Sequence, residues 1–325
     1  MHILIIGAAG MVGAKLTKRL VADRSLAGKP IDALTLADWV AATPPADASF
    51  PVRIEAVDLA TPGAAERLVA SRPDVIFHLA AIVSGEAEAD FDKGYRINLD
   101  GTRLLFDAIR KIGDGYRPRV VFTSSIAVFG APFPEAIVDE FFHTPLTSYG
   151  TQKAIDELLL SDYTRRGFMD GVGIRLPTIC VRPGKPNKAA SGFFSGIIRE
   201  PLAGAEAILP VPETVRHWHA SPRSAVGFLV HAAGLDGDRL GSRRNFTMPG
   251  VAATVAEQIA ALRKVAGDTV ANRIRHEPDA PIMKIVEGWP RNFAPERALA
   301  LGFRAENNFE EIVRIHIEDE LGGTW

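Results

Sequence analysis

The chain begins Met1-His-Ile-Leu-Ile-Ile-Gly7-Ala-Ala-Gly10-Met-Val-Gly13, and this stretch decides the expected fold. His2–Ile6 is an apolar run of strand length, and a helical pattern follows it from about Met11. Glycines spaced three apart between a strand and a helix allow a tight turn, close approach to a phosphate, and close packing of the helix on the strand. The helix N-terminus adds free N–H groups and a partial positive charge. The stretch therefore predicts a dinucleotide pyrophosphate site formed by Gly7, Gly10, Met11, Val12 and Gly13.

Short apolar runs and helical patterns alternate through the first half of the chain. This alternation is typical of a parallel sheet covered by helices, because each crossover between parallel strands needs a helix. The expected further strands are Ala33–Leu36, Arg53–Val57, Val75–Leu79, Arg119–Thr123 and Gly173–Leu176. The expected further helices are Pro62–Ala70, Gly94–Lys111 and Tyr149–Tyr163. The fold class is therefore α/β, with a doubly wound parallel sheet of the Rossmann type.

The regular alternation weakens after about Val181, where proline and glycine become frequent. Irregular stretches of this kind often carry binding residues on a rigid scaffold. Helical patterns return at Ser224–Ala233, Val255–Val265 and Phe309–Leu321. We expect an NAD-binding domain of residues 1–180 with a return segment at about 218–248, and a smaller mixed α/β substrate domain of residues 181–217 and 249–325.

The composition excludes several classes of protein. The 325 residues are 47% hydrophobic and 23% charged, with a net charge of −2, so nothing marks the chain for binding nucleic acid or an anionic membrane surface. No apolar run approaches the roughly 20 residues of a membrane span, and the N-terminus lacks the basic region of a signal peptide. Cys180 is the single cysteine, which excludes an internal disulfide. We expect a cytoplasmic protein in which Cys180 is a small buried hydrophobic residue.

Two acidic residues lie where strands of the predicted sheet end. Asp38 comes 25 residues after Gly13, and a carboxylate there can accept hydrogen bonds from the adenosine ribose hydroxyls while repelling a 2′-phosphate. This position predicts NAD rather than NADP, although a carboxylate that only caps the strand end is the alternative. Asp58 and Leu59 end the next strand and are expected to contact the adenine ring, unless they form a simple turn.

Tyr149 and Lys153 are four residues apart, which places them one turn apart on the same face of a helix. An unperturbed tyrosine ionises near pH 10, roughly three units too high for a useful base. A neighbouring ammonium group and an oxidised nicotinamide ring both favour the phenolate. Without further context, the pair would be an ordinary contact between exposed side chains.

That context comes from the fifth predicted strand, which ends in the hydroxyl residues Ser124 and Ser125. Ligands of open parallel sheets bind at the carboxyl edge, where such a strand ends. Ser125 can donate a hydrogen bond to the substrate oxygen beside Tyr149, with Ser124 as the rival for this role. The alternative for both is a serine that belongs to a turn.

Several segments together carry a family resemblance: Gly7-x-x-Gly10-x-x-Gly13, Asp58-Leu59, His78-Leu-Ala-Ala81, Asn98, Ser124-Ser125-Ile-Ala-Val-Phe-Gly130 and Tyr149-x-x-x-Lys153. Over roughly residues 1–182 they resemble the extended short-chain dehydrogenase/reductase, or NAD-dependent epimerase/dehydratase, superfamily. The resemblance implies that Ser125, Tyr149 and Lys153 are catalytic and that Lys153 also holds the nicotinamide ribose. It further implies that Leu79, Ala80, Ala81, Asn98, Pro177 and Thr178 line the cofactor. It also implies a homodimer through the helices of the Gly94–Lys111 and Tyr149–Tyr163 regions.

The chain departs from the nucleotide-sugar members of this superfamily at three places. Phe129-Gly130 stands where they usually have Tyr-Gly, Thr178 where they have asparagine, and Arg216–Ser224 replaces the segment expected to hold a nucleotide diphosphate. Four segments are similar to those of the D-erythronate dehydrogenase branch: Leu36–Trp39, Ser125–Gly130, Arg175–Gly184 and His217–Pro222. That resemblance implies oxidation of a small hydroxy acid at C2, giving 2-oxotetronate and NADH. Either Arg182 or Arg216 would then bind the substrate carboxylate, with Ser84 at a substrate hydroxyl. The alternative for Arg182 is a residue of a surface loop.

Two alternatives to this function remain open. One is a nucleotide-sugar epimerase or dehydratase that recycles NAD, and the other is a non-catalytic dinucleotide sensor that binds partner proteins. The sensor is disfavoured because it would need the glycine loop but not the Ser–Tyr–Lys set. His217 and His219 lack a third ligand nearby in the sequence, so we expect no metal site.

Overall fold

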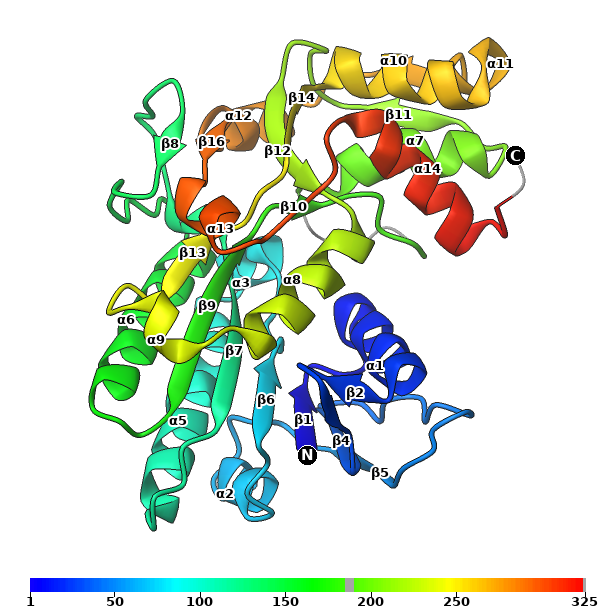
Figure 1. Cartoon of the computed structure of the whole chain (residues 1–325). Coiled ribbons are helices and arrows are strands. Elements are labelled where there is room, and N and C mark those ends of the chain that lie inside the picture. Colours follow the sequence, from blue (N-terminus) through cyan, green and yellow to red (C-terminus); the bar gives the residue numbers. More distant parts are fainter. Residues whose placement is uncertain (185–189, 324–325) are drawn as a thin grey trace. The chain divides into compact units, whose positions relative to one another are not determined.

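The computed structural model describes residues 1–184 and 190–323. These divide into two compact units (Figure 1). The first unit comprises residues 1–128, 147–175 and 226–246, and the second comprises residues 129–146, 176–225 and 247–325.

The first unit is built on a seven-stranded sheet with the strand order β13-β9-β7-β6-β1-β4-β5. From the central β1, the chain adds β4 and β5 on one side and then β6, β7 and β9 on the other, so the order reverses beside β1. Ligands of doubly wound sheets bind at the carboxyl ends of the strands where this reversal occurs. The strands are β1 His2–Ile6, β4 Ala33–Asp38, β5 Val52–Ala56, β6 Val75–His78, β7 Arg119–Ser125, β9 Asp170–Leu176 and β13 Asn245–Thr247. The predicted α/β class with a doubly wound sheet is confirmed.

Apolar side chains pack between one face of this sheet and the helices that cover it. Leu4, Ile76 and Val120 come from neighbouring parallel strands, and Phe106 and Leu160 come from helices in the same buried cluster. Burial on both faces explains why the central strands are continuous apolar runs rather than alternating ones. The helices of the first unit are α1 Met11–Asp23, α2 Ala64–Val69, α3 Ser84–Ala89, α4 Phe91–Gly94, α5 Gly101–Ile112, α6 Ser148–Arg165 and α9 Gly237–Leu240; a short hairpin joins β2 Ser25–Leu26 and β3 Lys29–Pro30.

The long helix expected over Gly94–Lys111 is divided into three parts. The α-helix α4 is followed by a π-helix over Tyr95–Asp100, and α5 begins at Gly101. π-helical turns are uncommon and often occur at functional sites. This one carries Asn98, whose side chain is buried.

The second unit contains short strands and several helices. β10 Thr178–Ile179 and β14 Val251–Thr254 flank β12 Arg216–Ala220; β11 Ala207–Leu209 pairs with β15 Ile274–His276, and β8 Ile137–Val138 with β16 Phe293–Ala294. Its helices are α7 Gly192–Leu202, α10 Val255–Ala266, α11 Asp268–Ala271, α12 Ala280–Glu287, α13 Glu296–Ala300 and α14 Phe309–Glu320, and α8 Pro222–Gly234 runs from this unit into the first. The expected helices at Ser224–Ala233, Val255–Val265 and Phe309–Leu321 are confirmed to within a few residues. None of the helices in the described part of the chain is long and apolar enough to cross a membrane.

Candidate active site

The glycine loop has the geometry that its spacing predicts. Gly7 has a φ of +93°, and a Cβ atom there would lie 2.6 Å from the Ala80 nitrogen. A Cβ atom on Gly13 would lie 2.2 Å from the Gly7 carbonyl oxygen, so only glycine lets α1 pack this closely on the loop. Gly10 is the N-cap of α1 and provides no side-chain cap for the first turn. The N–H groups at this helix end are therefore suited to bind a pyrophosphate together with the backbone of Met11 and Val12.

Asp38 lies at the carboxyl end of β4, beside the glycine loop. Its carboxylate accepts hydrogen bonds from the backbone nitrogens of Ala9, at 2.9 Å, and Trp39, at 2.8 Å. These two bonds fix the carboxylate against the loop, where it would meet the adenosine ribose.

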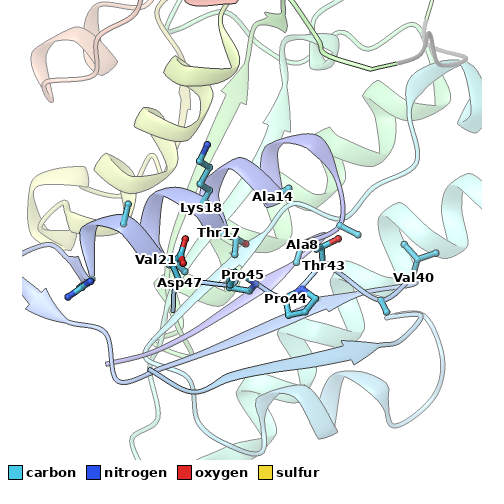
Figure 2. A pocket seen from close by; sticks show the side chains of 15 residues that line it. Ala8, Ala14, Thr17, Lys18, Val21, Val40, Thr43, Pro44, Pro45 and Asp47 are labelled. Carbon is cyan, nitrogen blue, oxygen red and sulfur yellow. The ribbon is translucent and has the colours of Figure 1, made fainter. Parts of the chain in front are cut away.

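A pocket of about 750 Å³ opens between α1 and the segment that follows Asp38 (Figure 2). Its walls include Ala8 of the glycine loop, Thr17 and Val21 of α1, and the chain from Val40 to Asp47 apart from Ala42. The glycine loop therefore borders open space on this side of α1.

Asp58 and Leu59 follow β5. The Asp58 carboxylate accepts hydrogen bonds from the Ala60 backbone nitrogen at 2.9 Å and from the Arg96 guanidinium at 2.7 Å. Burial alone would raise the pKa of Asp58, but these hydrogen bonds outweigh burial and lower it. Asp58 therefore keeps its charge, and Leu59 beside it is buried.

Asn98 contacts the loop that follows β6 through both ends of its amide. Its Oδ1 accepts a hydrogen bond from the Ile82 nitrogen at 2.9 Å, and its Nδ2 donates to Gln152 Oε1 at 2.7 Å and to the Ile82 oxygen at 3.3 Å. Leu79, Ala80 and Ala81 immediately precede this anchored position and are partly exposed. Asn98 therefore shapes the loop predicted to line the cofactor.

Ser124 and Ser125 lie in different environments at the end of β7. Ser124 is buried, and its hydroxyl donates to Glu157 Oε1 at 2.5 Å. Glu157 is itself fully buried and forms an ion pair with Arg175 at 2.7 Å. Ser125 is only partly buried, and its Oγ accepts a hydrogen bond from the Ala127 nitrogen at 3.1 Å. The hydroxyl of Ser124 is thus engaged in the core, which favours Ser125 over Ser124 as the substrate contact.

Substituting each serine by alanine separates these roles. Ser125→Ala is expected to lower kcat by about 10²–10³-fold with little change in stability, because a hydrogen bond to the reacting oxygen is lost. Ser124→Ala should retain kcat within a few-fold but lower the free energy of unfolding by about 1–3 kcal/mol, because buried Glu157 loses a donor. Steady-state kinetics and urea unfolding of both variants check this. A larger loss of kcat in Ser124→Ala than in Ser125→Ala would reverse the assignment.

The start of α6 lies against the segment that follows Ser125. A Cβ atom on Gly150 would lie 2.2 Å from the Ala127 carbonyl oxygen, so glycine is required at this approach. The Thr147 side chain caps the helix by accepting a hydrogen bond from the Gly150 nitrogen at 3.0 Å. These contacts place Tyr149, which is partly exposed, near the Ser125 end of β7.

Lys153 is fully buried one turn further along α6. Its Nζ donates to the Thr123 carbonyl oxygen at 2.9 Å and lies 5.8 Å from the centre of the Tyr149 ring. Burial lowers the pKa of Lys153, while the carboxyl groups of Asp156 and Glu157 oppose this effect. The ammonium group is therefore held close to the phenol that it is predicted to activate.

Two buried acidic residues beside Lys153 were not predicted from the sequence. Asp156 and Glu157 follow Lys153 by three and four residues, on a helix whose neighbouring positions are also buried. Burial raises the pKa of Asp156 well above its usual value, which favours its neutral form. The signal available in the sequence was the spacing, because residues three and four positions after Lys153 lie on the same face of the helix.

The remaining predicted residues lie in several places. Ser84 begins α3 and is partly buried, Pro177 is buried, and Thr178 is partly buried on β10. The Arg182 guanidinium donates to the Ile179 oxygen at 3.0 Å and to Ser191 Oγ at 3.1 Å. Arg216 is exposed at the start of β12, where it lies 3.5 Å from the Glu257 carboxylate.

Residues 1–184 and 190–323 contain no group of three or more His, Cys, Asp or Glu side chains arranged to hold a metal ion.

Cys180 is buried as expected, and its thiol donates to the Phe194 oxygen at 3.3 Å. Burial raises the pKa of this thiol to about 12. Burial therefore favours the neutral thiol, and Cys180 is part of a buried hydrophobic cluster.

Three buried histidines predict how stability depends on pH. Burial lowers the pKa of His78 to about 3 and that of His217 to about 4, and it lowers the pKa of His219 well below 6.5. Below pH 6.5 the unfolded chain binds protons that the folded chain does not, so acidification favours unfolding. Between pH 6.5 and 5 we expect the free energy of unfolding to fall by up to about 1.4 kcal/mol per pH unit for each histidine.

Urea unfolding at several pH values in this window measures the slope. The variant His217→Gln should show a shallower slope, because glutamine does not titrate. A stability that stays constant or rises on acidification would contradict the prediction.

Comparison with known proteins identifies the family of the chain and several of its relatives. A sequence model of the NAD dependent epimerase/dehydratase family matches residues 3–219. The D-erythronate dehydrogenase of Cupriavidus necator is 49% identical over 98% of both chains, and that of Haemophilus influenzae is 42% identical over 99% of this chain and 100% of its own.

Comparison with solved structures finds the same fold. A structure from Agrobacterium tumefaciens described as a nucleoside-diphosphate-sugar epimerase is 69% identical, with a TM-score of 0.98 over 100% of this chain and 95% of its own. The Thermus thermophilus UDP-glucose 4-epimerase in complex with NAD is 21% identical and shares the fold, with a TM-score of 0.76 over 100% of both chains. The resemblance found in the motifs is confirmed, and the chain belongs to the NAD dependent epimerase/dehydratase family.

Proposed function

We propose that this enzyme uses NAD to oxidise the C2 hydroxyl of a small sugar acid, with D-erythronate as the substrate and 2-oxotetronate as the product. The observation that carries the proposal is the arrangement of Ser125, Tyr149 and Lys153 at the carboxyl end of β7, where α6 approaches the strand. The near full-length similarity to two D-erythronate dehydrogenases supports the choice of substrate.

The mechanism follows from the chemistry of these three residues. Bound NAD supplies the acceptor for the hydride that leaves C2. Tyr149, as the phenolate, takes the proton of the C2 hydroxyl, and Ser125 donates a hydrogen bond to the oxygen as it becomes a carbonyl. Lys153 stabilises the phenolate by its positive charge. The C–H and O–H bonds at C2 break, a carbonyl forms, and the electron pair leaves with the hydride.

The cofactor residues form three groups around the proposed NAD site. Gly7, Gly10, Met11, Val12 and Gly13 would bind the pyrophosphate, for which the uncapped N-terminus of α1 is suited. Asp38, Asp58 and Leu59 would bind the adenosine. Leu79, Ala80, Ala81, Asn98, Pro177 and Thr178 would line or shape the nicotinamide side, together with Lys153 at its ribose.

The substrate carboxylate needs a cation, for which we propose Arg182 or Arg216, with Ser84 at a hydroxyl. Arg216 lies 3.5 Å from the Glu257 carboxylate, and the Arg182 guanidinium donates to the Ile179 oxygen and to Ser191 Oγ. Replacing each arginine by methionine and comparing KM for the acid identifies the one that binds it.

A second candidate function is epimerisation of a nucleotide sugar, because the structure that is 69% identical is described as a nucleoside-diphosphate-sugar epimerase. Against this, Arg216–Ala220 forms strand β12, in which His217, Trp218 and His219 are all buried. Three of the side chains in the segment expected to hold a nucleotide diphosphate therefore belong to the core.

We also propose that the protein is a cytoplasmic homodimer with a cofactor domain and a substrate domain. Leu158 on α6 is 64% exposed, on one of the two helices that family analogy places in a dimer interface. Light scattering of the wild type and Leu158→Glu tests this: a dimer that the substitution converts to a monomer supports it, and a wild-type monomer refutes it.

A substrate panel tests the proposed function. Wild-type enzyme is assayed with four-carbon and five-carbon sugar acids and either NAD or NADP, following absorbance at 340 nm. We expect reduction of NAD with D-erythronate and much weaker reduction of NADP, because Asp38 opposes a 2′-phosphate. Interconversion of UDP-sugars without net reduction, and no turnover of any sugar acid, would favour the epimerase instead.

A further inference from the structure

Two of the three places where the sequence departs from nucleotide-sugar enzymes are in direct contact. Thr178, on β10, lies 2.7 Å from His217 Nε2 through its Oγ1. The two residues lie on adjacent parallel strands, since Thr178 pairs with His219 in the register of β10 and β12. The departures at positions 178 and 217 therefore form one hydrogen-bonded unit.

The other ring nitrogen of His217 determines the direction of this hydrogen bond. His217 Nδ1 lies 2.8 Å from the Pro290 carbonyl oxygen, which can only accept, so Nδ1 carries the proton. Burial lowers the pKa of His217 to about 4, although the bond to Pro290 opposes this, so the ring is neutral near pH 7. Nε2 then has a lone pair and no proton. Thr178 must therefore donate its hydroxyl proton to His217.

The imidazole ring is also fixed in orientation. His217 is 3% exposed, and its ring is stacked on Phe194 with centres 5.3 Å apart and planes 5° apart. The Trp289 ring lies 5.2 Å away at a tilt. Because the ring is packed on these aromatic residues, its two hydrogen bonds keep one geometry.

The direction of this hydrogen bond determines what the Thr178 hydroxyl oxygen can still bind. A hydroxyl has one proton and two lone pairs, so Thr178 Oγ1 keeps acceptor capacity after donating to His217. Thr178 is partly buried and comes two residues after β9, which ends at the carboxyl edge of the sheet. Ligands of such sheets bind at that edge.

We propose that His217 is a positioning residue that commits Thr178 to act as a hydrogen-bond acceptor for a donor group on the bound reactants. The donor is an N–H of the nicotinamide carboxamide or an O–H of the sugar acid. This inference rests on the proposed function.

Conservative substitutions at both positions provide the test. Glutamine at position 217 extends an amide oxygen to the place of Nε2 and can accept from Thr178. Asparagine keeps a donor for Pro290 but is too short to reach Thr178. At position 178, serine keeps the hydroxyl, whereas valine keeps the shape without it. The assays are steady-state kinetics with D-erythronate and titration calorimetry with NAD alone.

We expect Thr178→Val and His217→Asn each to weaken reactant binding by roughly tenfold, the effect of one lost hydrogen bond. Thr178→Ser and His217→Gln should stay within about threefold of wild type, and the double variant Thr178→Val/His217→Asn should be no worse than Thr178→Val alone. A tenfold rise in the dissociation constant of NAD identifies the carboxamide as the donor. A tenfold rise in KM with unchanged NAD affinity identifies the sugar acid.

Wild-type binding in Thr178→Val overturns the inference, as does a loss in His217→Gln equal to that in His217→Asn. If the His217 variants fail to fold, comparison of Thr178→Val with Thr178→Ser decides it. Failure of the wild type to oxidise any sugar acid is a different result, because it rejects the proposed function, whereas NAD titration of the Thr178 variants still tests the acceptor.

Discussion

Replacing Tyr149 by phenylalanine is expected to lower kcat/KM by about 10³-fold while leaving NAD affinity within a few-fold of wild type. The substitution removes the hydroxyl that takes the C2 proton and keeps the ring beside Lys153, whose Nζ lies 5.8 Å from the ring centre. A general base typically contributes about 10²–10⁴-fold to rate. Steady-state kinetics with D-erythronate and titration calorimetry with NAD measure the two effects separately.

Tyr163 on the same helix provides a matched control. Its hydroxyl donates to Asp107 at 2.8 Å, which is a contact between α6 and α5. Tyr163→Phe should therefore retain kcat/KM within about threefold and affect mainly stability, by about 1 kcal/mol for the lost hydrogen bond. Full activity in Tyr149→Phe, or equal losses in the two variants, would reject Tyr149 as the base.

Replacing Lys153 by methionine is expected to have the next largest effect, a loss of about 10²–10³-fold in kcat/KM at pH 7. Methionine has a similar length but carries no charge, so the phenolate of Tyr149 loses its stabilising cation. The pKa of the catalytic group should rise, since an opposite charge nearby lowers the pKa of an acid. Activity should therefore recover in part at higher pH.

A pH–rate profile from pH 6 to 10 distinguishes this role from simple damage to the core. Lys93→Met is the control, because Lys93, on α4, pairs with Glu86 at 2.6 Å and is not among the proposed catalytic, cofactor or substrate residues. The control should keep the wild-type profile. A Lys153→Met enzyme with reduced activity but an unshifted profile would show that the lysine acts only through packing or cofactor binding.

The parts of the fold that depend on local pattern could be predicted from the sequence. The strand β1, the glycine loop and the start of α1 were placed correctly, because glycine spacing and an apolar run act over a few residues. The large sheet followed from the alternation of strands and helices. The position of Lys153 one turn from Tyr149 followed in the same way from helical geometry.

Features that depend on tertiary contacts could not be predicted from the sequence. The π-helix at Asn98 coincides with hydrogen bonds to Ile82 and Gln152, which are 16 and 54 residues away in the sequence. The helix α7 contains Gly196 and Pro201, which disfavour helices, so packing must override local preference there. Strand β12 was not predicted, because the histidines in its buried positions interrupt the apolar pattern that indicates a strand. The distinction between Ser124 and Ser125 likewise required the buried partner Glu157.

The most direct test of the proposed hydride transfer follows the hydrogen on C2 of the substrate. D-erythronate carrying deuterium at C2 is incubated with the enzyme and NAD, and the reduced cofactor and the product are analysed by mass spectrometry. We expect deuterium to appear in the reduced cofactor, 2-oxotetronate to form in equal amount, and no deuterium to be released to water. Deuterium retained in the oxidised sugar acid, or released to solvent without cofactor reduction, would contradict hydride transfer from C2.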